Sequence, residues 1–117
     1  MTKKQMYYFR KKLESWKLNI ETEMQEELEL ELKNELLNLE DADEGDVIDK
    51  RNIIDFQEKR KNYYNKILNE IKYALKKIEE NTFGICEETG EEINFKRLDA
   101  NPIARFSLEA QSVRENY

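Results

Sequence analysis

Carboxylates are concentrated in one short segment of this 117-residue chain, residues 40–46, whose sequence is Glu-Asp-Ala-Asp-Glu-Gly-Asp. Six of these seven residues are carboxylates or glycine, and none is a large apolar residue. Carboxylates placed in this way can make charge-assisted hydrogen bonds, or perturb groups around a catalytic metal ion. The plain alternative is a solvated acidic loop that keeps a turn soluble, and composition alone favours that alternative.

The chain has a single cysteine, Cys86, and no histidine. It therefore cannot form an internal disulfide or a Ser–His or Cys–His nucleophile pair. There is no glycine-rich phosphate loop, and carboxylate pairs on wet helices lack the desolvated pocket that tunes acid–base catalysts. We expect no enzyme activity from this chain alone. Reduced cysteine suits a cytoplasmic location, and no run approaches the ~20 apolar residues of a membrane span.

The charge balance favours a protein partner over nucleic acid. With 26 acidic and 20 basic residues the net charge is −6, the opposite of a generic nucleic-acid binder. Because the acidic stretches would repel a phosphate backbone, we expect no direct sequence-specific DNA binding. Basic residues such as Lys59, Lys76 and Arg105 could grip an acidic partner, although solvated helix charge is the simpler interpretation of any one of them.

Two long segments that flank the acidic run have helical periodicity. The first extends from about Lys3 to Leu39, with Thr2 as a possible N-cap, and the second from about Val47 to Glu80, with Asp46 as a possible N-cap. Apolar residues recur in both at spacings of three and four, with a gap near residue 60. They are Met6, Phe9, Leu13, Trp16, Ile20, Met24, Leu28 and Leu32 in the first, and Ile53, Phe56, Tyr64, Ile67, Ile71, Leu75 and Ile78 in the second.

Helices of similar length joined by a short turn should pack as an antiparallel coiled coil. The sequence thus predicts a mainly α fold with a long helical hairpin over residues 1–80, whose acidic tip is near residues 40–46. Residues 81–117 are predicted to form a second region. There Asn81–Gly84 should break the helix, Glu87–Gly90 should be the turn of a small knuckle, and Asn101–Pro102 should start a short helix.

Several motifs resemble the DksA/TraR family of bacterial proteins. Residues 74–87 (ALKKIEENTFGICE) are similar to the family's approach to its zinc finger, and residues 97–102 (RLDANP) to its R-L-E-A-x-P stretch. Residues 5–17 (QMYYFRKKLESWK) resemble the start of the family's coiled-coil arm. Asp43 and Asp46 fall where the family has a D-x-x-D pair at the tip. The resemblance covers nearly the whole chain, in the same order and spacing.

The resemblance implies a transcription regulator that binds RNA polymerase core or holoenzyme without needing a DNA site. The coiled coil would enter the secondary channel, bring Asp43 and Asp46 near the catalytic magnesium, and change open-complex lifetime. Family members commonly have alanine two positions after the second aspartate, where this chain has Ile48, so detailed potency could differ. We expect a cytoplasmic monomer.

The same resemblance places four zinc-site positions of the family on Cys86, Thr89, Ser107 and Ala110. A structural zinc site needs four Cys or His ligands, so we expect the finger to be degenerate and free of zinc. Apolar packing should replace the metal, with Cys86 buried and its pKa raised by neighbouring carboxylates. The residues expected to pack together are Phe83, Ile85, Ile93, Phe95, Leu98, Ile103, Phe106 and Leu108.

Family members that take part in the stringent response work with the nucleotide ppGpp, held partly by basic side chains. In a gap-free register those positions are Glu70, Asn101 and Gln111, none of them cationic, so we expect a weak or absent ppGpp response. Two alternatives remain open. One is a helical adaptor that binds another protein, and the other is a Gre-like transcript-cleavage factor, which also uses an acidic coiled-coil tip.

Overall fold

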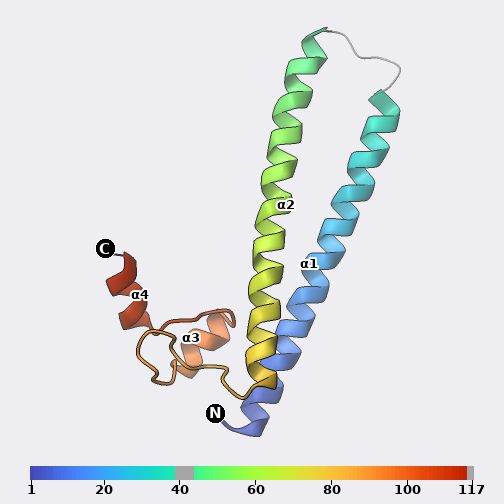
Figure 1. The fold of residues 1–117 in the computed structure, drawn as a ribbon. Coiled ribbons are helices and arrows are strands. Elements are labelled where there is room, and N and C mark those ends of the chain that lie inside the picture. Colours follow the sequence, from blue (N-terminus) through green and yellow to red (C-terminus); the bar gives the residue numbers. More distant parts are fainter. Residues whose placement is uncertain (39–43, 116–117) are drawn as a thin grey trace. The chain divides into compact units, whose positions relative to one another are not determined.

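The computed structural model describes residues 1–38 and 44–115, and for residues 38 and 44–50 it describes the backbone alone. Two long helices, α1 (Lys3–Asn38) and α2 (Glu44–Glu79), are followed by two short ones, α3 (Phe95–Ala100) and α4 (Leu108–Glu115) (Figure 1). The predicted mainly α fold, with a helical hairpin before a small finger-like region, is confirmed.

Local hydrogen bonds explain where the long helices begin and end. The Gln5 N–H donates to Thr2 Oγ1 at 3.1 Å while the Thr2 N–H donates to Gln5 Oε1 at 3.0 Å, which is a capping box. At the end of α2, Asn81 has φ 60° and the Thr82 N–H donates to the Lys77 carbonyl at 2.9 Å, as in a Schellman motif. The predicted N-cap and the predicted helix break are confirmed.

The start of α2 differs from the prediction. The helix begins at Glu44, so Asp46 lies inside it and is not its N-cap. The last three residues of the predicted turn at residues 40–46 therefore belong to α2. The physical reason is that negatively charged residue types are favoured in the first turn of a helix, where backbone N–H groups are unpaired. A glycine among them does not prevent helix formation there.

The chain contains two compact units, and α1 and α2 contribute to both. The finger unit comprises residues 1–17 and 69–117, and the hairpin unit comprises residues 18–68. The core of the finger unit is apolar and includes four side chains with no exposed area, those of Phe9, Leu13, Ile71 and Leu98. The hairpin unit buries fewer side chains, among them Ile20, Tyr64 and Leu68.

The apolar residues predicted to pack between the two long helices are not buried along the whole length of the hairpin. In the hairpin unit Leu32, Ile53 and Phe56 are 52%, 54% and 60% exposed, so that part of the prediction is wrong. The helices there are joined by polar groups instead. Arg60 forms an ion pair with Glu27 at 2.5 Å, which explains the gap in the apolar pattern at that position.

The short C-terminal helix was also placed wrongly by sequence. Asn101 ends α3, and the last helix begins only at Leu108 (Figure 1). Between them the backbone has other partners, because the Phe106 carbonyl accepts from Arg97 Nε at 2.9 Å. Of the residues predicted to pack together, Phe83, Ile93 and Leu98 are buried, whereas three are exposed. The exposed ones are Ile85, Phe95 and Leu108.

Candidate functional site

The three predicted tip residues fall where little of the structure is described. Asp43 lies outside the described residues. Asp46 and Ile48 belong to the first turns of α2, and only their backbone is described. The role of this tip therefore stays a prediction from the sequence.

The hairpin unit presents a surface that combines apolar and acidic side chains. Leu30, Leu36 and Leu37 of α1 are 59%, 70% and 66% exposed, which is unusual for large apolar residues on a wet helix. Residues 18–37 of α1 include seven acidic residues and only one basic residue. Such a surface suits contact with a partner protein that covers leucines and offers positive charge.

The four predicted zinc positions lie together in the finger unit. Cys86 Sγ is 3.8 Å from Ser107 Oγ, and Ser107 Oγ accepts from the Ala110 N–H at 3.2 Å at the start of α4. The knuckle that contains Thr89 is closed by the Gly90 N–H, which donates to the Cys86 carbonyl at 2.9 Å. The four positions therefore lie around the knuckle and the start of α4, and only Cys86 among them has a thiol.

Hydrogen bonds favour the thiolate form of Cys86. Burial of the thiol opposes ionisation, but the Thr89 hydroxyl and the backbone N–H groups of Ser107, Thr89 and Glu88 outweigh it and lower the pKa of Cys86 to about 6. The expectation of a raised pKa is wrong because the neighbouring carboxylates point to other partners. Glu88, for example, is paired with Arg114 at 2.9 Å.

Folding stability should therefore depend on pH through Cys86. A pKa of about 6 in the folded protein, against an ordinary value of 9.0, means that the unfolded chain binds more protons between those pH values. Stability should rise as pH increases from about 6 to about 9, and the gain should be lost as pH falls through about 6. Urea unfolding of the native chain and of Cys86→Ala at pH 5.5, 7.5 and 9 checks this. A difference between the two that does not change with pH would show that the thiol stays protonated.

A group of side chains, here called the clasp, fastens the finger region to the end of α2. Arg105 forms a bidentate pair with Glu70 at 2.9 and 3.0 Å, and its guanidinium lies 3.9 Å from the centre of the Tyr73 ring. Glu87 accepts from the Tyr73 hydroxyl and from Lys77 Nζ, each at 2.6 Å. Burial opposes ionisation of Glu87, yet these two donors hold the pKa of its carboxyl below the ordinary value.

Comparison with known proteins identifies the family. Residues 81–116 match the prokaryotic dksA/traR C4-type zinc finger. The RNA polymerase-binding transcription factor DksA of Caulobacter vibrioides is 35% identical over 115 residues, which cover 98% of this chain and 79% of that protein. This chain belongs to the DksA/TraR family.

Two further proteins are similar to this DksA/TraR chain in sequence or fold. General stress protein 16O of Bacillus subtilis is 48% identical over 46 residues, 39% of this chain and 28% of that protein. The structure of transcription factor DksA2 from Pseudomonas aeruginosa superposes with a TM-score of 0.85 at 28% identity, and the match covers 99% of this chain and 87% of that chain.

The zinc ion that the family description implies does not fit the residues of this DksA/TraR protein. Ser107 and Thr89 offer neutral hydroxyls and Ala110 offers no ligand atom, whereas structural zinc takes thiolate or imidazole at all four corners. Within residues 1–38 and 44–115, no group of three or more His, Cys, Asp or Glu side chains could hold a metal ion.

The clasp in this DksA/TraR protein was not predicted from the sequence. The sequence indicates Arg105 only as a solvated charge or a contact for an acidic partner, and Glu70 only as a non-cationic position in the ppGpp register. A signal was present, because Glu70, Tyr73 and Lys77 share one helix face at spacings of three and four. Their partners, Glu87 and Arg105, are 10 and 35 residues away in sequence, so only the tertiary fold brings them together.

Among the described residues of this DksA/TraR protein, no helix is both long enough and apolar enough to cross a membrane.

Proposed function

We propose that this chain is a cytoplasmic transcription regulator, and no enzyme, that binds RNA polymerase directly. It would insert its acidic coiled-coil tip into the secondary channel and alter the stability of open complexes. The observation that carries the proposal is the Caulobacter relative, an RNA polymerase-binding transcription factor that matches 98% of the chain. A similarity of this extent includes both helices of the hairpin and the finger region.

The surface of the hairpin unit supports this function. A narrow passage in a partner protein would cover exposed leucines such as Leu30 and Leu37, and burial of each is worth roughly 1.5–3 kcal/mol before entropy costs. The tip residues Asp43 and Asp46 would then act on the active centre by charge. Ile48, which is larger than the alanine common in the family, would modify the fit.

The test is in vitro transcription from a ribosomal RNA promoter with purified RNA polymerase. We expect the protein to change the half-life of open complexes at that promoter, and the change to be nearly the same with and without ppGpp. Of the three positions that hold ppGpp in the family, two have the uncharged residues Asn101 and Gln111 in this chain. The third has Glu70, whose carboxylate forms an ion pair with Arg105. Strong synergy with ppGpp would contradict the nucleotide part of the proposal, and failure to bind polymerase would contradict all of it.

Two other functions predict different results in simple assays. A Gre-like cleavage factor would stimulate transcript cleavage in backtracked complexes, and we expect no such activity here. A helical adaptor for another protein would not co-purify with polymerase core. The match of 98% of this chain to a polymerase-binding relative favours the regulator over both alternatives.

A further inference from the structure

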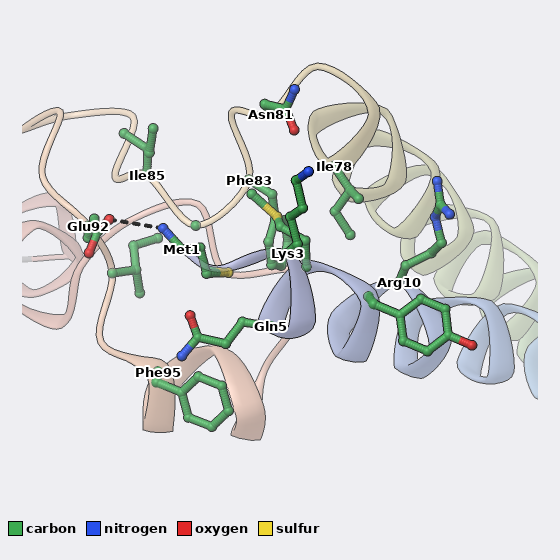
Figure 2. Close-up of a pocket in the computed structure, with 14 residues that line it drawn as sticks. Met1, Lys3, Gln5, Arg10, Ile78, Asn81, Phe83, Ile85, Glu92 and Phe95 are labelled. Atoms are coloured by element: carbon green, nitrogen blue, oxygen red, sulfur yellow. Dashed lines mark hydrogen bonds and ion pairs between the residues drawn. The ribbon is translucent and has the colours of Figure 1, made fainter.

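A second surface, separate in its residues from the tip, lies in the finger unit. A cavity of about 490 Å³ opens between the start of α1 and the segment that follows α2 (Figure 2). We call it the N-terminal cavity. Its volume is in the range of known ligand sites, which is roughly 300–1,000 Å³.

The wall of the N-terminal cavity has an apolar part and a polar part of similar extent. Phe83 and Ile93 line it and are each 4% exposed, so they belong to the core of the unit. Tyr7, Ile85 and Phe95 also line it but are 60%, 39% and 42% exposed. Large apolar side chains exposed around one concavity mark a surface that another molecule can cover.

Two cations on α1 lie beside this apolar surface. Lys3 and Arg10 both line the cavity, and in Figure 2 their side chains extend to the same side of the helix. Neither has an ion pair within the part of the chain that the structure describes. The carboxylate on the wall, Glu92, is held by the Met1 amino group at 3.3 Å. The cavity therefore combines an apolar surface with unneutralised positive charge.

The spacing of these cations indicates what would fit. Seven residues of helix separate Lys3 from Arg10, a rise of about 10.5 Å along the axis. In an extended polyproline II segment, which has three residues per turn and a rise of about 3.1 Å per residue, carboxylates three positions apart lie on the same face, about 9 Å from each other. We propose that the N-terminal cavity binds an extended acidic segment of a partner protein, with carboxylates at positions i and i+3 and an apolar side chain between them.

A peptide matches this surface better than a single-stranded nucleic acid does. Nucleic acid would need a continuous basic groove along its phosphates, whereas this cavity has two cations beside the carboxylate of Glu92. The chain as a whole carries a net charge of −6. An apolar peptide side chain would also cover Ile85 and Phe95, which a phosphate backbone would not.

Titration of a synthetic peptide into the full chain tests the inference without polymerase. The probe is the capped hexapeptide Gly-Asp-Leu-Ser-Asp-Gly, followed by ¹⁵N–¹H correlation spectra. We expect saturable shifts at residues around the cavity, and about tenfold weaker binding by Lys3→Glu/Arg10→Glu, equivalent to about 1.4 kcal/mol. The matched control is Lys4→Glu/Lys72→Glu, which makes the same charge change in the finger unit at exposed residues that do not line the cavity.

Three outcomes would overturn the inference. The first is the absence of saturable shifts up to millimolar peptide. The second is equal weakening by both double variants, which would indicate general electrostatic attraction. The third is displacement of the peptide by a thymidine dodecamer at a lower concentration than the peptide itself requires. Loss of binding in the Lys3→Glu/Arg10→Glu variant alone, with its spectrum otherwise unchanged, would support the inference.

Discussion

Replacing Asp43 and Asp46 with asparagine is expected to remove at least about nine-tenths of the effect on open-complex lifetime, while polymerase affinity changes by less than about twofold. Asparagine keeps the size and polarity of aspartate but removes its charge, so helix formation should continue. If the tip acts on groups around a catalytic metal ion, charge is the property that matters there. Binding should persist because the exposed leucines of the hairpin unit supply most of the apolar contact area.

A matched control separates position from charge at this tip. The Glu40→Gln/Asp41→Asn variant loses the same two charges from the same acidic run. We expect it to retain most of the activity of the native chain in the ribosomal RNA promoter assay. If the two double variants behave alike, the acidic run acts only through its total charge, and the assignment of Asp43 and Asp46 is wrong.

The triple variant Thr89→Cys/Ser107→Cys/Ala110→Cys is expected to bind one zinc ion that the native chain cannot hold. With Zn–S bonds of about 2.3 Å, the sulfurs of a tetrahedral site are about 3.8 Å apart. Cys86 Sγ and Ser107 Oγ are already 3.8 Å apart. The N–H groups that lower the pKa of Cys86 would also favour a metal-bound thiolate there.

The expected gain in stability from zinc is large. Structural zinc contributes about 10 kcal/mol or more in small zinc fingers that are unfolded without the metal. The gain in folding free energy should be smaller here, because the finger region already folds on an apolar core. Thermal unfolding with zinc and with a chelator measures it, and cobalt substitution reports tetrahedral thiolate ligation by absorbance. The same triple variant with Cys86→Ser should bind the metal far more weakly. Absence of stoichiometric binding would mean that the four positions do not surround a common point.

The finger region is held in position by two kinds of contact. Phe9 packs against Phe83 and Phe95, each with ring centres 5.3 Å apart, so α1 contributes an aromatic side chain to the finger core. The clasp adds charged groups at the surface, where a pair such as Arg105–Glu70 contributes on the order of 1 kcal/mol or less on its own. Apolar burial is therefore the larger contribution, as the sequence predicted, although it uses partly different residues.

The predictions that succeeded depend on local chemistry. Helical spacing of apolar residues, the Thr2 cap and the break at Asn81 are each decided by interactions over a few residues, so they can be recognised in the sequence. Thr89 and Ala110 are also recognised in the sequence as residue types that do not ligate structural zinc, and the absence of the metal stays a prediction. These features determined the mainly α hairpin, the finger-like region and the family to which the chain belongs.

What only the tertiary structure decided depends on groups distant in sequence. The pKa of Cys86 is lowered by backbone donors that include Ser107, 21 residues away, and Arg105 is paired with Glu70, 35 residues away. Periodicity also cannot tell whether an apolar stripe is covered, and Phe56 remains 60% exposed although its spacing suits a seam. Burial and pKa are set by the groups that surround a side chain in space, and a single sequence does not specify which groups those are.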